Sequence, residues 1–249
     1  MQQQDNLNIY DQIAEEFAVS RRNLKWPEWE YFRPYLGAKS EGQRAKGKEQ
    51  HFDRVQDMIG ILDLGCGSGR LISLVKDYPV EYVGLDVSDK LLIKAKELIA
   101  SYKLPQYHSI RGKQAISYKL ISGGMTDLSF SVDDQFDLVF ALASFHHLET
   151  DKDRLKCLQE IKRALKPDGH LLMTNWNLWQ KRFEKNAVDQ NGNLIIPWKN
   201  TQGKVLAERV YHRFDLEELE KLFLEAGLVV IKNFKTEFNL VSIVQKVGN

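Results

Sequence analysis

The sequence is poor in the residues on which covalent and metal-built scaffolds depend. Its 249 residues include two cysteines, Cys66 and Cys157, and no cluster of Cys and His has metal-ligand spacing. We therefore expect neither a disulfide framework nor a metal site. No apolar run approaches the roughly 20 residues that cross a bilayer, and the polar first residues lack the basic and apolar segments of a signal peptide. These absences predict a cytoplasmic protein that does not contact a membrane.

The charge is nearly balanced, which excludes the strongly basic composition of many nucleic-acid binders. There are 35 basic and 34 acidic residues, for a formal net charge of +1. Two segments are nevertheless locally basic: residues 20–54 hold nine Lys/Arg against five Asp/Glu, and residues 162–185 hold six against two. Either segment can form a basic surface, although a solvated face is the more common origin of such a run.

From residue 58 onwards, apolar strand patterns alternate with helical ones. Strands are expected at residues 59–64, 80–85, 120–123, 136–142, 170–174, 228–234 and 240–245, and helices at 71–76, 90–102, 151–165 and 215–225. This alternation predicts an α/β fold with a parallel sheet and helices on both faces. Before it, helices are expected at 8–18 and from Pro27, and the polar, glycine-rich stretch 37–50 reads as a mobile linker. Residues 177–209 interrupt the rhythm with mixed polar and aromatic sequence.

The glycine-rich turn I-L-D-L-G-C-G-S-G-R at residues 61–70 is the most informative stretch. Gly65, Cys66, Gly67 and Gly69 would let a ligand approach the backbone at a strand-to-helix turn. The spacing is G-x-G-x-G, not the G-x-G-x-x-G of dinucleotide enzymes. The carboxylate of Asp63 would repel a pyrophosphate by about 4 kcal/mol. It would favour a ligand with an ammonium and a sulfonium, such as S-adenosylmethionine, although a simple turn-capping role is the alternative.

Asp86 ends the second strand, 17 residues after Gly69. A carboxylate at this distance can accept hydrogen bonds from both hydroxyls of a ribose. The alternative is a helix N-cap, for which Ser88 or Asp89 is better placed.

These motifs resemble those of the class I S-adenosylmethionine-dependent methyltransferases with a type 11 domain. The resemblance covers residues 58–175, through D-L-G-C-G-S-G, G-L-D-V-S and L-K-P-D-G-H-L. It implies a Rossmann-like, seven-stranded, mostly parallel sheet with one antiparallel strand near the edge. It also implies S-adenosyl-L-methionine as cofactor and S-adenosyl-L-homocysteine as product. The implied cofactor contacts are Gly65 to Gly69, Asp86, Val87, Ser88, Tyr10, Arg21 or Arg22, Met125, Thr126 and Ala141. Gly124 stands where many members carry an adenine-contacting Asp.

The outer segments resemble one subfamily, the tRNA methyltransferases that esterify a carboxymethyl group on the wobble uridine. The matching pieces are Y-D-Q-I-A-E-E-F from Tyr10, W-P at Trp26, S-F-H-H-L from Ser144, I-P-W ending at Trp198, and V-Y-H-R-F from Val210. Residues 37–57 and 103–119 are inserted or diverged. The resemblance implies tRNA as a partner, and the eukaryotic members use a small zinc-binding activator subunit.

A carboxylate acceptor needs no base, since it is anionic at neutral pH and can attack a sulfonium methyl directly. His146 and His147 could orient the acceptor, or serve as a base for a hydroxyl; in the alternative His147 caps a turn. An aromatic and basic set could form an acceptor-side lid on which a base stacks, or simply the core of that lid. Its members are Trp176, Trp198, Tyr211, His212 and Arg213.

These interpretations divide the chain into four parts. We expect an N-terminal helical cap and linker (1–57), the cofactor-binding core (58–176), an inserted acceptor-side lid (177–214) and the closing helix and strands of the core (215–249). Two other functions stay open: a small-molecule O-, N- or C-methyltransferase, and a cofactor-binding scaffold without catalysis.

Overall fold

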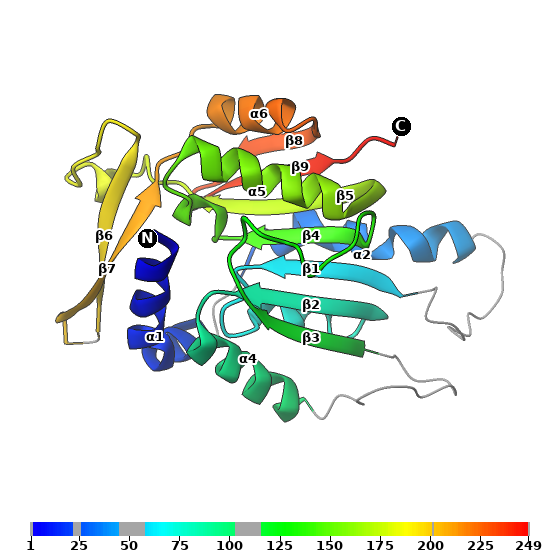
Figure 1. Cartoon of the computed structure of the whole chain (residues 1–249), viewed down its shortest axis with the longest axis horizontal. Helices are drawn as coiled ribbons and strands as arrows, with labels where there is room; N and C mark the ends of the chain where they lie inside the picture. The colour runs from blue at the N-terminus through cyan, green and yellow to red at the C-terminus, as the bar shows by residue number, and fades with distance from the viewer. Residues whose placement is uncertain (1, 22–25, 45–57, 103–115, 201, 249) are drawn as a thin grey trace.

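The computed structural model describes residues 2–21, 26–44, 58–102, 116–200 and 202–248, and its main feature is a seven-stranded sheet (Figure 1). The strand order is β3-β2-β1-β4-β5-β9-β8, in which β9 runs antiparallel to both its neighbours and the other neighbouring pairs are parallel. The strands are β1 (Ile59–Leu64), β2 (Val80–Asp86), β3 (Ile116–Ser122), β4 (Phe136–Leu142), β5 (Leu165–Trp176), β8 (Val229–Lys235) and β9 (Asn239–Gln245). The predicted Rossmann-like sheet, with one antiparallel strand next to the edge, is confirmed.

Helices cover both faces of the sheet because its strands are apolar on both sides. Leu62 and Leu64 of β1 face the core cluster that contains α5 (Asp151–Ala164) and α6 (Leu216–Glu225). Ile59 and Ile61 face a second cluster, which contains residues of α2 (Trp29–Arg44), α3 (Arg70–Val75) and α4 (Asp89–Ser101). Each fully buried aliphatic side chain of this kind contributes about 1.5–3 kcal/mol.

Several predicted boundaries were wrong; the first helix, for example, spans Gln2–Arg21 and not 8–18. β5 begins at Leu165, not at residue 170, because the Pro167-Asp168-Gly169 turn is absorbed as an irregularity within the strand, with Asp168 at φ 63°. β3 begins at Ile116 and not at 120. Part of the expected linker 37–50 is helical, since α2 continues to Arg44 despite Pro34; residues 45–50 lie outside the described residues.

The expected lid contains an unpredicted β-hairpin. β6 (Asn193–Lys199) and β7 (Val205–His212) pair antiparallel as a separate two-stranded sheet. Figure 1 shows this hairpin and α1 (Gln2–Arg21) on the side toward which the carboxyl ends of β1, β2 and β4 point. α1 is fixed to the core because Ser88 Oγ donates to Asp11 (2.6 Å) and Lys94 pairs with Glu15 (2.7 Å). The four-part division of the chain stays a prediction.

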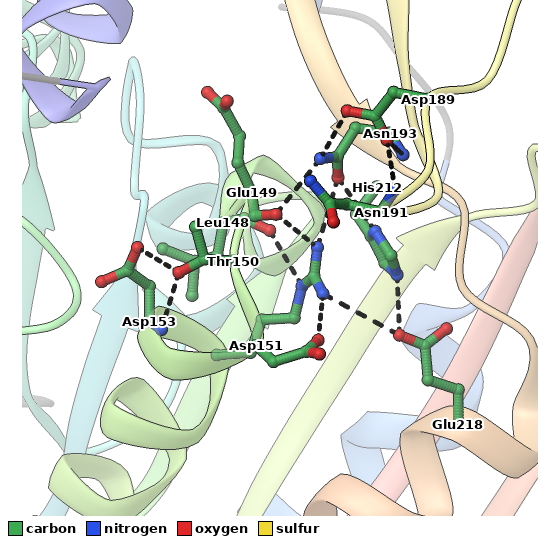
Figure 2. A network of polar contacts seen from close by, with 11 residues as sticks. Leu148, Glu149, Thr150, Asp151, Asp153, Asp189, Asn191, Asn193, His212 and Glu218 are labelled. Atoms are coloured by element: carbon green, nitrogen blue, oxygen red, sulfur yellow. Dashed lines mark hydrogen bonds and ion pairs between the residues drawn. The ribbon is translucent and has the colours of Figure 1, made fainter.

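The hairpin is joined to the core by the buried side chain of Arg154, which leaves only 1% of its surface exposed (Figure 2). Its guanidinium donates to the carbonyls of Leu148 (3.0 Å) and Glu149 (3.0 Å), and to Asn193 Oδ1 on β6 (3.2 Å). It also pairs with Asp151 at 2.6 Å, but that carboxylate is 86% exposed. Arg154 therefore fixes the loop after β4 relative to the hairpin.

Replacing Arg154 by Met should lower the free energy of unfolding by about 3 kcal/mol, since it removes the buried hydrogen bonds to Leu148, Glu149 and Asn193. For a protein of this size we expect a fall in Tm of roughly 6–12 °C, measured by differential scanning fluorimetry. Asp151→Asn is the matched control and should cost less than about 1 kcal/mol, because its carboxylate is solvated. Equal effects of the two substitutions would contradict the role of Arg154.

Candidate functional site

A cavity of about 810 Å³ lies between α1, the carboxyl edge of the sheet and the β6–β7 hairpin. Most of the side chains predicted to bind the cofactor or the acceptor line it. These are Tyr10, Arg21, Asp63, Gly65, Cys66, Gly67, Asp86, Val87, Met125, His146, His147, Trp176 and Tyr211. Its size is in the range of small-molecule sites, and segments far apart in the sequence form its walls.

The glycine turn forms the floor of the cavity. Gly67 lines the cavity with φ +53°, a left-handed conformation that favours glycine, and a Cβ there would be in van der Waals contact with the ring of Phe17 at 3.6 Å. Gly65 has a different reason to be glycine, because its Cβ would lie 2.5 Å from Ser144 Cβ. Gly69 does not line the cavity: its Cβ would meet Ala95 of α4 at 3.1 Å, so this glycine permits close packing of the turn on the helix.

Two buried carboxyls face the cavity beside this turn. Burial raises the pKa of Asp63 to about 7, although Tyr82 donates a hydrogen bond to it at 2.7 Å. Burial also raises the pKa of Asp86 to about 6, against the hydrogen bonds donated by the backbone N–H groups of Ser88 and Gly67. Both carboxylates are costly to hold here without a ligand, so a cation beside Asp63 and hydroxyl donors beside Asp86 would stabilise them.

Arg209 on β7 occupies the opposite wall and was not predicted. It is 3% exposed, and its guanidinium lies 4.8 Å from the ring centroid of Trp198 and 5.0 Å from that of Tyr211. It donates one hydrogen bond, to Tyr10 Oη at 3.3 Å, while its Nε has no partner. Within the described residues, no carboxylate lies at ion-pair distance from the Arg209 guanidinium. A buried, unpaired guanidinium is expensive, so this wall is suited to an anion.

A second guanidinium adds to this positive wall. Arg21, at the end of α1, also lines the cavity; burial lowers its pKa, and the charge of Arg209 lowers it further. Its guanidinium lies 5.2 Å from the ring centroid of Phe17 and 5.7 Å from that of Trp198. Two cations held near one another by aromatic rings favour an anionic ligand between them.

The hydrogen bonds of the two histidines fix their protons. The backbone N–H of Trp176 donates to His146 Nδ1 (3.2 Å), so the proton of the neutral ring is on Nε2, which is buried without a partner. His147 donates from Nδ1 to the carbonyl of Val210 (3.1 Å) and accepts from Tyr10 Oη at Nε2 (2.8 Å). Burial lowers the pKa of both rings, that of His147 to about 3. Neither ring has a free lone pair with which to take a proton from an acceptor.

Several predicted residues lie outside the cavity. Ser88 caps α4, accepting from Leu91 N–H, and Ala141 lies in the core of the sheet; Thr126 is buried without lining the cavity. Trp198 contacts Arg209 and Phe17 but is not among the lining residues. Arg22 lies outside the described residues.

His212 and Arg213 require a correction, since neither reaches the cavity where an acceptor would bind. His212 bonds Asn193 Oδ1 (3.0 Å) and Glu218 Oε1 (2.7 Å) in the network of Figure 2. Arg213 lies over the ring of Trp179, 4.0 Å from its centroid. Side chains alternate along a strand, so Arg209 and Tyr211 share the inner face while His212 points to the other side. Recognition of β7 as a strand would have identified Arg209 from this alternation.

Residues 62–173 match the family described as "Methyltransferase domain". This match lies on the glycine turn, Asp86 and the strands whose carboxyl ends form the cavity floor. Residues 62–173 therefore form a methyltransferase domain, and its cofactor is S-adenosyl-L-methionine.

The methyltransferase is similar over most of its length to two curated relatives. A protein of Encephalitozoon cuniculi, named as a methyltransferase with unproven activity, is 27% identical over 243 residues, 96% of this chain and 93% of the relative. The tRNA (carboxymethyluridine(34)-5-O)-methyltransferase of Schizosaccharomyces pombe is 26% identical, with 90% of this chain and 89% of the relative covered. The Arabidopsis thaliana enzyme of the same name is 25% identical, but the chain spans only 38% of its length.

Solved structures share the fold of the methyltransferase. An S-adenosylmethionine-dependent methyltransferase from Methanosarcina mazei has a TM-score of 0.60 at 20% identity, covering 83% of this chain and 98% of that one. The methyltransferase subunit of a complex with the Haloferax volcanii Trm112 activator has a TM-score of 0.53 at 17% identity, with 97% and 98% covered.

The cavity of the methyltransferase fits its cofactor. The glycine turn that lines the cavity at Gly67, the buried carboxyl of Asp63 and the buried carboxyl of Asp86 suit a ligand with a cationic methionine part and a ribose. Cys66 is not a nucleophile, because burial raises the pKa of its thiol well above the ordinary range. Across the described parts of the chain, no group of three or more His, Cys, Asp or Glu could hold a metal ion, and no helix is long and apolar enough to cross a membrane.

Proposed function

We propose that this methyltransferase esterifies a carboxylate, the carboxymethyl group on the wobble uridine of a tRNA. The observation that carries the proposal is the buried guanidinium of Arg209, which lines the cavity without an acidic partner. The buried Nε2–H of His146 is a second unused donor on the same wall. Buried hydrogen-bond donors that have no acceptor in the protein favour a ligand with several lone pairs and a negative charge, and a carboxylate has both. The names of the two carboxymethyluridine enzymes agree with this chemistry.

In this mechanism the residues position and desolvate, and no proton has to move. When bound, S-adenosylmethionine supplies an electrophilic methyl group. Asp63 and Asp86 hold the cofactor at one end of the cavity, while Arg209 and His146 fix the acceptor carboxylate at the other. Tyr10, Phe17 and Arg21 of α1 cover the site and exclude water, which strengthens these electrostatic contacts. Because the acceptor is already anionic, the neutral histidines suffice as donors.

The basic surface offers partial support for a tRNA partner. Lys181 and Lys185 are exposed beside Arg182, which lines the cavity. The other part of that basic segment is not at the cavity: Arg163 pairs with Glu160 and Asp133, and Lys166 pairs with Asp137, near the start of β5 at the opposite edge of the sheet. Phosphate contacts near the site would therefore come from residues 181–185. An activator subunit remains part of the proposal, by analogy with the complex from Haloferax volcanii.

The test is transfer of labelled methyl from S-adenosylmethionine to total tRNA, with a small-metabolite extract in parallel. We expect label on tRNA that mild alkali releases, because an ester is alkali-labile. Alkali-stable label would move the chemistry to a base or a ribose. Label only in the extract would favour a small-molecule methyltransferase. One observation supports that second candidate: the hairpin contributes the apolar Ile196 and Pro197 to the lining of the cavity.

Tyr10→Phe should lower kcat/KM for the acceptor by about 10-fold, because the hydroxyl joins Arg209 to His147 across the cavity. The affinity for S-adenosylhomocysteine should fall less than the rate if Tyr10 acts mainly through Arg209. Tyr31→Phe, on an exposed ring of α2, is the control and should leave both values unchanged. A loss confined to cofactor affinity would contradict this role and place the hydroxyl on the cofactor.

A further inference from the structure

A buried carboxylate lines the cavity and is not used by the mechanism above. Glu28, in the turn that leads into α2, is 1% exposed. Its Oε1 accepts hydrogen bonds from Asn239 Nδ2 (2.7 Å) and Thr236 Oγ1 (3.1 Å). Its Oε2 is buried and has no hydrogen-bond partner among the described residues. Leaving a buried carboxylate oxygen without a donor is costly, so the free oxygen is a strong acceptor for a ligand.

The strand order places Glu28 on the acceptor side of the cavity. Its partner Asn239 begins β9 and lies opposite Trp176 of β5, whose backbone N–H holds His146. Neighbouring strands are about 4.8 Å apart, so β9 lies roughly 14 Å from Asp63 on β1, three strand positions away. Glu28 is thus joined to the strand that lies beside Trp176 and His146.

Arg70 interacts electrostatically with Glu28, but its guanidinium also has other neighbours. Its guanidinium lies over the ring of Trp26, 4.5 Å from the centroid. No hydrogen bond or ion pair joins it to Glu28 in the part of the chain that the structure describes. Arg70 also faces Asp63, so its charge is shared between the two ends of the cavity.

We propose that Glu28 determines acceptor specificity, because its free Oε2 accepts a hydrogen bond from an N–H of the ring that carries the acceptor carboxylate. This inference rests on the proposed function. A uracil presents an imide N–H between two carbonyls, whereas cytosine has a lone pair at the same position. A buried carboxylate oxygen binds the first and repels the second. Sites built to hydrogen-bond a donor discriminate strongly against analogues that lack it.

The substitution Glu28→Gln inverts this preference for a ring N–H over a lone pair, with little change in the shape of the side chain. The amide oxygen is retained by the donors on Asn239 and Thr236, so the amide NH₂ faces the cavity in place of an acceptor. Glu28→Ala removes both oxygens. Glu30→Gln is the matched control, because Glu30 is two residues further on, in the first turn of α2, but pairs with Arg33 at the surface.

The experiment uses the full-length protein and two synthetic anticodon stem-loop RNAs. Both carry 5-carboxymethyluridine at the wobble position, and one is also methylated at the ring N3, which removes the N–H. We measure kcat/KM for ester formation, the Kd of S-adenosylhomocysteine, and Tm. We expect the wild-type protein and Glu30→Gln to prefer the unmethylated RNA. Glu28→Gln should lose about 10- to 100-fold in kcat/KM on that RNA, and Glu28→Ala should lose most of the preference, with cofactor affinity unchanged.

The other possible results distinguish a failure of the Glu28 inference from a failure of the proposed function. An active wild-type protein whose Glu28 variants behave like Glu30→Gln overturns the inference alone. A loss of S-adenosylhomocysteine affinity in Glu28→Gln also overturns it, since the donor then belongs to the cofactor. Absence of an alkali-labile ester with the wild-type protein overturns the proposed function and this inference together. The Tm values identify a variant that fails to fold. If Glu28→Ala does not fold, the ratio of kcat/KM on the two RNAs for Glu28→Gln decides whether the inference holds.

Discussion

Replacing Arg209 by Met is expected to lower kcat/KM for a carboxylate acceptor by about 100-fold or more. Removing one partner of a buried charge pair typically costs 2–5 kcal/mol in binding. The affinity for S-adenosylhomocysteine should change little, because Arg209 is on β7, away from the glycine turn. The free protein should be as stable as the wild type or more stable, since the substitution removes a buried charge that has no acidic partner. Steady-state kinetics, calorimetric titration and urea unfolding measure the three quantities.

Two further variants make the Arg209 experiment specific. Arg209→Lys keeps the charge but loses the two-pronged donor geometry, so its loss should be intermediate. Arg213→Met is the matched control, four residues along, where the guanidinium stacks on Trp179 outside the cavity. Equal losses in Arg209→Met and Arg213→Met would show that the effect is structural. A marked loss of stability in Arg209→Met would contradict the interpretation that the Arg209 charge is uncompensated in the free protein.

Asp63→Asn is expected to weaken cofactor binding at least 10-fold while stabilising the cofactor-free protein at alkaline pH. The amide keeps an oxygen for the hydroxyl of Tyr82 but carries no charge for a cationic ligand. The pKa of Asp63 is higher in the folded protein, about 7, than its ordinary value of 3.8. Its stabilising contribution is therefore present below about pH 4 and is lost as the pH rises through 7.

The raised pKa of Asp63 also determines the direction in which stability changes with pH. Relative to Asp63→Asn, the cofactor-free wild-type protein should lose stability between pH 5 and pH 8, by up to about 2.5 kcal/mol. Urea unfolding at the two pH values measures the difference, and S-adenosylhomocysteine should reduce it by stabilising the carboxylate. Asp77→Asn, at an exposed site, is the control and should show no such pH dependence. A wild-type protein that gains stability relative to Asp63→Asn as the pH rises would refute the raised pKa.

The sequence predicted the part of the site that depends on local pattern. The strands β1 and β4 have the expected bounds, since short apolar runs flanked by turns are clear signals. The glycine turn and Asp86 also lie where the pattern placed them, because the ends of adjacent parallel strands meet at one edge. Gly69 shows the limit of this reasoning: the motif includes it, but its contact is with Ala95.

The side of the cavity proposed to bind the acceptor, here called the acceptor wall, was less predictable. Its residues lie on one face of β7, a strand that the sequence pattern did not reveal. Pro197 within β6 and the mixed polar and aromatic sequence of residues 177–209 obscured the β6–β7 hairpin, so Tyr211, His212 and Arg213 were treated as one contiguous group. The two-residue period of β7 separates them and selects Arg209 with Tyr211. Glu28 had no local signal at all, since its role depends on contact with Thr236 and Asn239, more than 200 residues away.

The position of α1 and the hairpin has a consequence for the boundaries of the working unit. The matched domain covers residues 62–173, which include the glycine turn, Asp86 and both histidines. Tyr10, Arg21 and Glu28 precede it, and Arg209 and Tyr211 follow it. A protein trimmed to the matched domain would retain the cofactor floor and lose nearly the whole acceptor wall. Exchange of the two flanks as a pair, with the glycine turn left untouched, is accordingly expected to change which acceptor receives the methyl group.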